Sequence, residues 1–270
     1  MPELPEVETI ARGLAKRISG DVIESVWLGS KPEPLKSPAA EMTAALQAKR
    51  ISTVRRAGKH IVFDLESAGG ATAPAQWIVH LGMTGSLLVC APGLELEKHT
   101  HAVLQLASGR ELRFVDPRRF GRLSVIEKFE APGAEPLQIA FDDFAVLFHH
   151  RKTPIKSALL NQSLLSGVGN IYADEALFRS LIRPRRRAAS LTRVELRRLH
   201  NALKRVLRGA IHLGGSSFSD YVNADGEEGF FQLKHRVYGR EAEPCLVCKT
   251  PIKRIVIAGR SSHYCPRCQK

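Results

Sequence analysis

Four cysteines near the carboxyl end restrict the fold of this chain more than any other feature. Cys245 and Cys248 form one CxxC pair, and Cys265 and Cys268 form a second pair after residues 249–264. Two such pairs on facing turns present four thiolates in a tetrahedron, which is the arrangement that zinc prefers in structural sites. The alternative is a set of unpaired buried cysteines. Because protein ligands fill all four positions, we expect a structural zinc ribbon with no open position for a substrate.

The hydrophobic pattern changes its period near residue 130. Val7, Ile10, Leu14 and Ile18 recur at helical spacing, and the helix they predict ends at Gly20. Short apolar runs separated by turns then predict antiparallel strands at 22–28, 51–54, 60–65, 77–81, 86–90, 102–106, 111–114 and 121–125. Helical periodicity returns at 141–149, 154–162, 170–180 and 192–213, the last opened by a capping box from Thr192 to Glu195. We predict a β-sandwich domain at 1–132, a helical domain at 133–230 and the cysteine-rich ribbon at 231–270.

Positive charge is concentrated in the second half of the chain. Residues 1–136 contain 17 basic and 16 acidic residues, a net charge of +1, whereas residues 137–270 contain the remaining 23 and 11, a net charge of +12. A one-sided excess of this size predicts a polyanionic partner, most commonly nucleic acid. No uninterrupted apolar run approaches the roughly 18 residues that a membrane helix needs. We therefore expect no membrane span and a cytoplasmic protein.

The amino terminus could supply a nucleophile. Removal of Met1 would leave Pro2 with a secondary amine, which condenses with C1′ of a sugar to give an iminium. An α-amine is less basic than a lysine side chain, so more of it is neutral near pH 7. Glu3 and Glu6 lie beside it and could move protons. The alternative is that Pro2 only begins a helix.

Two further motifs suit contact with nucleic acid. The glycines of the Gly167-Val-Gly-Asn170 turn could expose helical N–H groups to a phosphate, with Asn170 and the earlier Lys156 nearby, although a plain turn between helices is the alternative. Arg118 and Phe120, in the run Asp116-Pro-Arg-Arg-Phe-Gly121, suit base contact with a wedged ring, and a core phenylalanine is the alternative. Lys59 and His60 open a strand, and both would ordinarily face solvent.

Together these residues resemble the bacterial formamidopyrimidine-DNA glycosylase family. Four blocks carry the resemblance in chain order: residues 2–9, residues 116–121, residues 167–172 and the cysteine ribbon. The resemblance implies an α+β fold, with an antiparallel β-sandwich and its amino-terminal helix followed by a helix–two-turns–helix domain and a zinc finger. It also implies one structural zinc ion, and damaged double-stranded DNA bound between the domains. The implied activity is excision of oxidised purines (8-oxoguanine, formamidopyrimidines) in base excision repair, followed by strand cleavage through β,δ-elimination. A monomer in the bacterial cytoplasm is expected on the same grounds.

The resemblance also implies residue roles. Pro2 is the nucleophile that attacks C1′, Glu3 donates the proton that opens the sugar, Lys59 serves β-elimination and Arg260 serves δ-elimination. The DNA-binding positions are His99, Arg118 and Arg151, with Lys156 and Asn170 as a phosphate clamp. Met83, Arg118 and Phe120 fill the space that the lesion leaves when it flips out of the helix, which is required because C1′ is inaccessible in a stacked duplex.

Two departures and two rivals remain. Arg151 stands where relatives often have lysine, and the loop at 67–74 is longer than the family pattern. The loop at 216–229 lies where relatives close over the damaged base. One rival is endonuclease VIII, a sister glycosylase with the same architecture that prefers oxidised pyrimidines, but Leu4 and Val7 favour the first family. The other is a non-catalytic binder, as in some ribosomal proteins, against which Pro2, Glu3 and Lys59 argue together.

Overall fold

The structure, a computed structural model, describes residues 1–67, 75–216 and 229–270. It divides into two compact units: Met1–Glu130 with Gly214–Gly229, and Ala131–Leu213 with Phe230–Lys270. The interiors of the two singled-out loops, 68–74 and 217–228, lie outside the described residues. The division at 132/133 and 230/231 stays a prediction.

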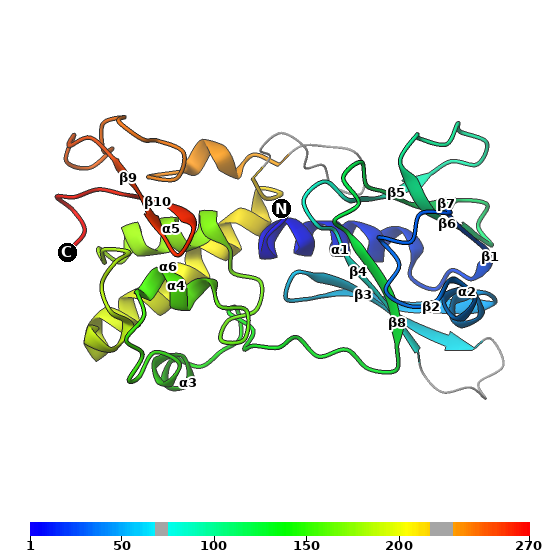
Figure 1. The fold of residues 1–270 in the computed structure, drawn as a ribbon, viewed down its shortest axis with the longest axis horizontal. Coiled ribbons are helices and arrows are strands. Elements are labelled where there is room, and N and C mark those ends of the chain that lie inside the picture. Colours follow the sequence, from blue (N-terminus) through cyan, green and yellow to red (C-terminus); the bar gives the residue numbers. More distant parts are fainter. Residues whose placement is uncertain (68–74, 217–228) are drawn as a thin grey trace. The chain divides into compact units, whose positions relative to one another are not determined.

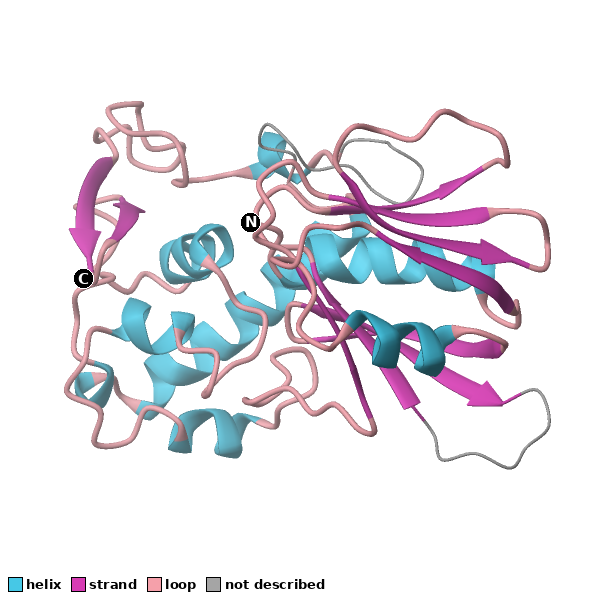
Figure 2. Cartoon of the chain, turned by 45° about the vertical axis from the view of Figure 1, so that its right-hand side comes forward, coloured by secondary structure: helices cyan, strands magenta, loops and turns pink. Residues whose placement is uncertain are grey.

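The first unit is a sandwich of two four-stranded antiparallel sheets (Figures 1 and 2). One sheet has the order β1-β6-β7-β5 and the other the order β2-β3-β4-β8. The strands are β1 (Ile23–Leu28), β2 (Lys49–Ala57), β3 (His60–Ser67), β4 (Ala75–His80), β5 (Ser86–Cys90), β6 (Thr100–Leu106), β7 (Glu111–Val115) and β8 (Arg122–Ile126). All eight predicted strands and the predicted sandwich are confirmed.

Two helices close the sides of the sandwich. Helix α1 (Leu4–Ile18) packs against β2 and β5, which are edge strands of different sheets. Helix α2 (Ala39–Leu46) packs against β1 and β8, the other two edge strands. Covering the edges hides backbone groups that would otherwise pair with another chain. The periodicity predicted α1 but missed α2, whose eight residues bury only Met42 and Leu46.

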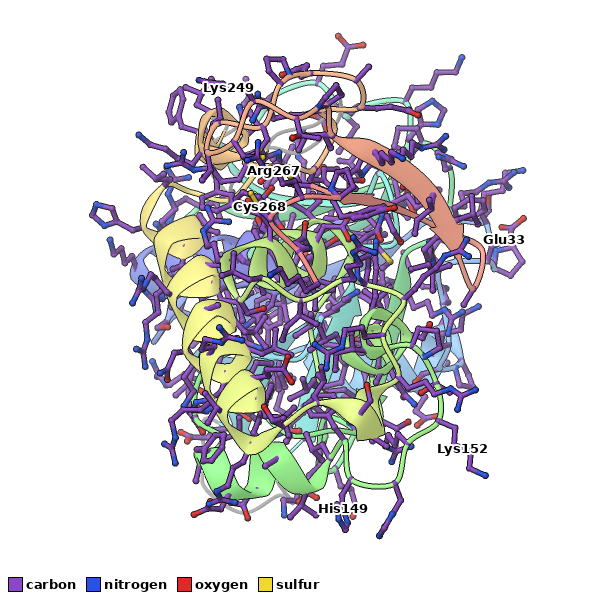
Figure 3. The ribbon with its side chains drawn as sticks, turned by 90° about the vertical axis from the view of Figure 1, so that its left-hand side faces the viewer. Glu33, His149, Lys152, Lys249, Arg267 and Cys268 are labelled. Carbon is purple, nitrogen blue, oxygen red and sulfur yellow. The ribbon has the colours of Figure 1, made fainter. Side chains whose placement is uncertain are left out.

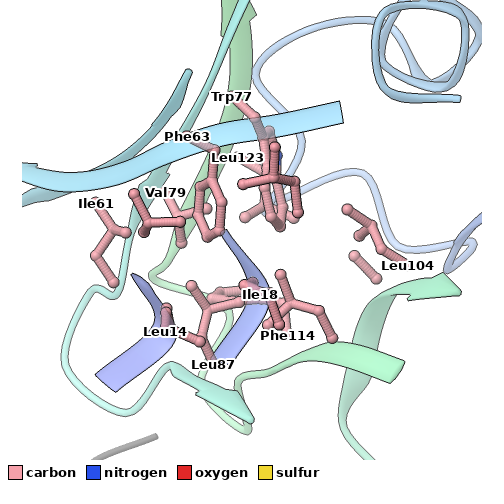
Figure 4. Packing of buried hydrophobic residues seen from close by; sticks show 14 of the residues in the cluster. Leu14, Ile18, Ile61, Phe63, Trp77, Val79, Leu87, Leu104, Phe114 and Leu123 are labelled. Atoms are coloured by element: carbon pink, nitrogen blue, oxygen red, sulfur yellow. The ribbon is translucent and has the colours of Figure 1, made fainter. Parts of the chain in front are cut away.

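The core of this unit lies between the sheets and against α1. Figure 4 shows Leu14 and Ile18 of α1 among side chains of both sheets, with Phe63 and Trp77 on one side and Phe114 on the other. The rings of Phe63 and Trp77 are 4.7 Å apart. Because these side chains are almost completely buried, α1 is held by the same apolar contacts that join the sheets.

The second unit is helical and carries the ribbon at its carboxyl end. Its helices are α3 (Phe141–Val146), α4 (Ile155–Leu160), α5 (Asn170–Arg179) and α6 (Arg193–His212). The predicted capping box is confirmed, because the Glu195 amide donates to Thr192 Oγ1 at 3.2 Å and the Thr192 amide donates to Glu195 Oε2 at 2.8 Å. Strands β9 (Lys253–Ile257) and β10 (Arg260–Tyr264) form an antiparallel hairpin between the cysteine pairs. Within the described part of the chain, no helix is long and apolar enough to cross a membrane.

We expect Leu14→Ala to destabilise the first unit by about 2–5 kcal/mol, because it opens a cavity between α1 and the sheets. Both tryptophans of the chain, Trp27 and Trp77, lie in this unit, so their fluorescence during urea unfolding reports on it selectively. Leu96→Ala is the control, since Leu96 is exposed. An equal effect of the two substitutions would contradict the assigned packing of α1.

Candidate functional site

The start of α1 organises the amino terminus. Glu3 caps the helix and is buried, and its amide donates to Glu6 Oε2 at 2.9 Å in a capping box. The other oxygen of Glu6, Oε1, accepts from the amide of Ser216 at 2.8 Å. Gly215 makes this possible: its φ is +84° and a Cβ there would lie 2.8 Å from Glu6 Oε1. Glu6 therefore ties the amino terminus to Gly215 and Ser216, far along the chain.

Charges of both signs act on the terminal amine. Burial is the main cause that lowers the pKa of the Met1 α-amine, and the positive charges of Lys59 and Arg118 lower it further. Glu3 and Glu6 act in the opposite direction. Removal of Met1 would pass the α-amine to Pro2, which is half-buried. The structure thus brings Glu3, Lys59 and Arg118 to bear on the Met1 amine, where the neutral form is favoured, and Pro2 is the next residue.

Lys59 lies in the tight turn between β2 and β3, and it is half-buried rather than exposed. The expectation that His60 faces solvent is also wrong. Its ring packs 5.0 Å from that of His80 and 4.8 Å from that of Phe129. Burial lowers the pKa of both histidines, that of His80 to about 4, so both rings are neutral at pH 7. The sequence does not reveal this packing, because histidine has both an apolar ring body and polar nitrogens and can therefore lie in solvent or against other rings.

Asp116 joins two loops that carry proposed DNA-contacting residues. Its side chain is fully buried and accepts from Thr84 Oγ1 at 2.6 Å, from the Arg118 amide at 3.2 Å and from the Gly121 amide at 2.7 Å. The amide of Asp116 donates to the carbonyl of His99 at 3.0 Å. The carboxylate therefore fixes the turn after β4 and the turn before β8, and the backbone amide of the same residue holds the approach to β6.

The apolar tips of these loops are exposed. Met83 is 44% exposed and Phe120 is 53% exposed, and the Arg118 guanidinium carbon lies 4.8 Å above the Phe120 ring. Gly82 packs on the backbone of Phe120, where a Cβ would come within 2.5 Å of the carbonyl carbon. Large apolar side chains held in solvent by a buried polar network suit contact with a partner rather than packing in a core. The core alternative for Phe120 is wrong.

In the second unit, the glycine turn leads into α5 as predicted. Gln162 holds the turn by accepting from the Gly167 amide at 2.9 Å and donating to the Val168 carbonyl at 2.8 Å. Asn170 is the first residue of α5, and its Nδ2 donates to Ser261 Oγ at 3.2 Å. Within the described residues, the buried Asn170 Oδ1 has no hydrogen-bond partner. An amide oxygen only accepts hydrogen bonds, so this atom calls for a donor, and the feature that favours an anion here is the set of N–H groups in the first turn of α5.

Lys156 is placed differently from a surface phosphate contact. It is fully buried on α4, 2.7 Å from Asp174 Oδ1, and its Nζ donates to the Ser261 carbonyl at 2.6 Å. Arg151 and Arg260, by contrast, are exposed. Arg260 begins β10 directly after the two-residue turn of Ala258 and Gly259. Pro2, Glu3, Lys59, Met83, His99, Arg118 and Phe120 belong to the first unit, and Arg151, Lys156, Asn170 and Arg260 to the second.

The four cysteines converge as their spacing predicts. Their sulfur atoms all lie within 4.8 Å of one another, and Figure 3 labels Cys268 with Lys249 and Arg267 of the same ribbon. Cys245 and Cys265 are buried, and the Cys268 amide donates to Cys265 Sγ at 3.4 Å. Burial raises the pKa of the Cys265 and Cys268 thiols, whereas hydrogen bonds to Thr250 lower the pKa of Cys248 to about 6. A bound metal ion favours the thiolate form of all four. Four converging sulfurs with an amide on a sulfur fit zinc, which would supply rigidity and no open coordination position.

Sequence reasoning missed the buried acids that organise these elements. Asp116 stood inside a recognised block without a role, and Asp174 and Glu175 went unnoticed on α5. Glu175 accepts from the amides of Arg236, Val237 and Tyr238 at 2.9–3.0 Å, which holds the segment that leads to the ribbon. The available signal was two adjacent carboxylates among the apolar residues of a helix, a position where acids are rarely buried without partners.

Comparison with known proteins agrees with this arrangement along the whole chain. Family models match residues 1–123 (Formamidopyrimidine-DNA glycosylase N-terminal domain), 132–222 (Formamidopyrimidine-DNA glycosylase H2TH domain) and 242–270 (Zinc finger found in FPG and IleRS). Formamidopyrimidine-DNA glycosylase of Solibacter usitatus is 46% identical over 280 aligned positions that cover both chains fully.

Solved structures are similar as well. The MutM (FPG) protein of Thermus thermophilus has a TM-score of 0.86 and 44% identity, over 99% of this chain and 98% of its own. A Lactococcus lactis FPG mutant in complex with Fapy-dG containing DNA has a TM-score of 0.89 and 32% identity, with both chains covered fully. Wild-type Lactococcus lactis FPG in complex with an oxidized pyrimidine containing DNA has a TM-score of 0.87 and 34% identity, again with both chains covered fully.

The fold and the site define a DNA glycosylase built from a β-sandwich, a helix–two-turns–helix domain and a zinc finger. The chain belongs to the formamidopyrimidine-DNA glycosylase family. Its ribbon holds one structural zinc ion.

We expect Cys248→Ser to lose zinc and to weaken DNA binding, because the ribbon folds around its metal. Metal content by atomic absorption and affinity for a duplex by fluorescence anisotropy would measure the two effects. Cys90→Ser is the matched control, since Cys90 lies on β5, outside the four-cysteine cluster. A Cys248→Ser protein that keeps its zinc and its affinity would contradict the assigned site.

Proposed function

We propose that this chain excises oxidised purines from double-stranded DNA and then cleaves the strand at the abasic site, with the α-amine of Pro2 as nucleophile. The observation that carries the proposal is the environment of the amino terminus. Burial lowers the pKa of the Met1 amine there, with Glu3 and Lys59 among the charges that act on it, and removal of Met1 would leave the Pro2 nitrogen next to these groups. An amine with a lowered pKa is an activated nucleophile, and the adjacent carboxyl can carry protons.

Excision begins with the lone pair of the neutral Pro2 nitrogen, which forms a bond to C1′. The bond from C1′ to the base breaks, and the base leaves with the electron pair and takes up a proton. Glu3 then donates a proton to the sugar ring oxygen as the bond between that oxygen and C1′ breaks. The Pro2 nitrogen loses its own proton, and an iminium joins it to C1′.

Strand cleavage follows from the iminium, which acidifies the hydrogen on C2′. Loss of this proton expels the phosphate on C3′ with its electron pair, and we assign Lys59 to this β-elimination. Loss of a proton from C4′ then expels the phosphate on C5′, and we assign Arg260 to this δ-elimination. A fixed guanidinium stabilises the charge that develops on a leaving phosphate.

Access to C1′ requires that the damaged nucleotide leave the base stack. The exposed Met83, Phe120 and Arg118 suit insertion into the space it vacates, since their loops are fixed by Asp116 rather than by burial of their tips. Wedged apolar side chains of this kind compensate for lost stacking.

The backbone of the DNA is held by residues of both units. We assign His99, Arg118 and Arg151 to direct contacts, and Asn170 to a phosphate at the start of α5, where N–H groups favour an anion. We assign Lys156 to the same clamp through its hydrogen bond to Ser261, which is also the partner of Asn170, while its charge is paired with Asp174. We further propose that the protein acts as a monomer on the DNA of the bacterial cytoplasm.

Pro2→Gly should abolish or severely reduce excision while leaving DNA affinity largely intact, because it removes the secondary amine and little binding surface. Borohydride trapping on a duplex with 8-oxoguanine opposite cytosine would measure this, with a thymine-glycol duplex alongside and peptide mapping of the adduct. We expect an adduct at Pro2 that forms faster on 8-oxoguanine.

Other outcomes of this trapping experiment would contradict parts of the proposal. Faster trapping on thymine glycol would move the preference to oxidised pyrimidines with the same chemistry. Unchanged turnover of Pro2→Gly, or no adduct from wild-type protein shown to lack Met1, would remove the nucleophile.

Binding should weaken steeply with salt, because each phosphate that is neutralised contributes about −0.9 to the slope of log affinity against log salt. Arg151→Ala should therefore make the slope shallower by about one phosphate contact. Lys31→Ala is the control, as an exposed cation of the first unit with no assigned contact. A flat salt response would argue against the basic second half as the DNA-binding region.

A further inference from the structure

A buried carboxylate lies beneath the hairpin that carries Arg260. Asp174 is fully buried on α5. Its Oδ1 is 2.7 Å from Nζ of the fully buried Lys156, and its Oδ2 accepts from the amide of His263 at 2.8 Å. The ring of His263 also lies close, with Nδ1 at 3.4 Å from Oδ2. One side chain therefore contacts both α4 and β10.

These contacts fix the residues that directly follow Arg260. Lys156, paired with Asp174, donates to the Ser261 carbonyl at 2.6 Å, and Asn170 donates to Ser261 Oγ at 3.2 Å. Arg260 itself is exposed, so its position depends on how β10, the strand that it begins, is held. Because Asn170 and Asp174 are one turn apart on α5, the same helix sets the position of Arg260 and of the proposed phosphate contact.

Replacing a whole buried ion pair by apolar groups is often neutral, since desolvation offsets the attraction, whereas removal of one partner leaves the other charge buried and unpaired. What the pair supplies here is a specific geometry. The zinc site does not account for it, because neither Asp174 nor Lys156 is a ligand. A rigid connection from β10 to α5 is useful where the Arg260 guanidinium must meet a leaving phosphate. The general stability of the ribbon does not require such a connection beside the turn of Ala258 and Gly259.

We propose that Asp174 is a positioning residue for strand cleavage: it holds β10 so that Arg260 meets the phosphate expelled in δ-elimination. The inference rests on the proposed function, in particular on the role assigned to Arg260. Asp174 touches no reacting atom. Its loss should change the products of cleavage rather than the formation of the iminium.

The test uses a 5′-labelled duplex with a single abasic site, so that base excision does not enter. β-Elimination alone leaves an unsaturated aldehyde at the 3′ end, whereas β,δ-elimination leaves a faster-migrating phosphate. For Asp174→Asn we expect the ratio of phosphate to aldehyde ends to fall by roughly tenfold, because small misplacements of a catalytic group are costly. Trapping at Pro2 and zinc content should stay near those of wild type.

Glu175→Gln is the matched control, since it neutralises the neighbouring buried carboxylate, which holds residues 236–238 and Arg179 instead. It should lower all activities together and leave the product ratio unchanged. Asp174→Ser replaces Asp174→Asn if the latter loses zinc, because the smaller serine places no amide donor against Lys156 Nζ or the His263 amide. Arg260→Ala combined with Asp174→Asn should give the same ratio as Arg260→Ala alone.

The outcomes separate the two proposals. If Arg260→Ala shifts the product ratio and neither Asp174 variant does, the positioning role is overturned and the proposed function stands. If Arg260→Ala also leaves the ratio unchanged, the role of Arg260 falls and this inference falls with it, while trapping at Pro2 still tests the nucleophile. A parallel loss of zinc, trapping and both eliminations in both Asp174 variants would make Asp174 a structural residue only.

Discussion

The burial of α1 against both sheets is the constraint on which the first unit depends. Leu4, Leu14 and Ile18 are fully buried, so the helix cannot shift without opening the core. Its amino-terminal end therefore has a defined place, and Glu3 and Glu6 are fixed with it by the capping box. A terminal amine is ordinarily among the most mobile groups of a chain. Packing one turn away therefore gives the amine the defined place that the proposed nucleophilic role requires.

Buried carboxylates perform the equivalent task in the loops. Glu6, Asp174 and Glu175 are each buried and accept hydrogen bonds from backbone amides of segments distant in sequence. The buried Asp116 accepts from the distant Thr84 hydroxyl and from the nearby Gly121 amide. A single carboxylate offers several lone pairs, so it can satisfy donors from two or three loops at once. In a chain with a net charge of +13, these acids serve architecture, and the excess cations remain for the partner.

Much of the fold could be predicted from the sequence because the relevant signals are local. The eight strands, the principal helices and the capping box at Thr192 follow from periodicity and turn residues. The short α2 was missed because its eight residues bury only Met42 and Leu46, too few for a periodic signal. His60 was misplaced because its packing depends on His80, at the end of β4, and on Phe129, in the segment after β8.

The sequence by itself determined the fold class, the zinc ligands and the residues that match the family, since these depend on residue type and spacing. Tertiary structure alone decided that Lys156 is buried beneath Ser261, that Asp116 joins two loops, and that Asp174 holds β10. Each of these contacts pairs atoms from segments far apart along the chain. Burial and charge pairing act through distance in space, which spacing along the sequence does not encode.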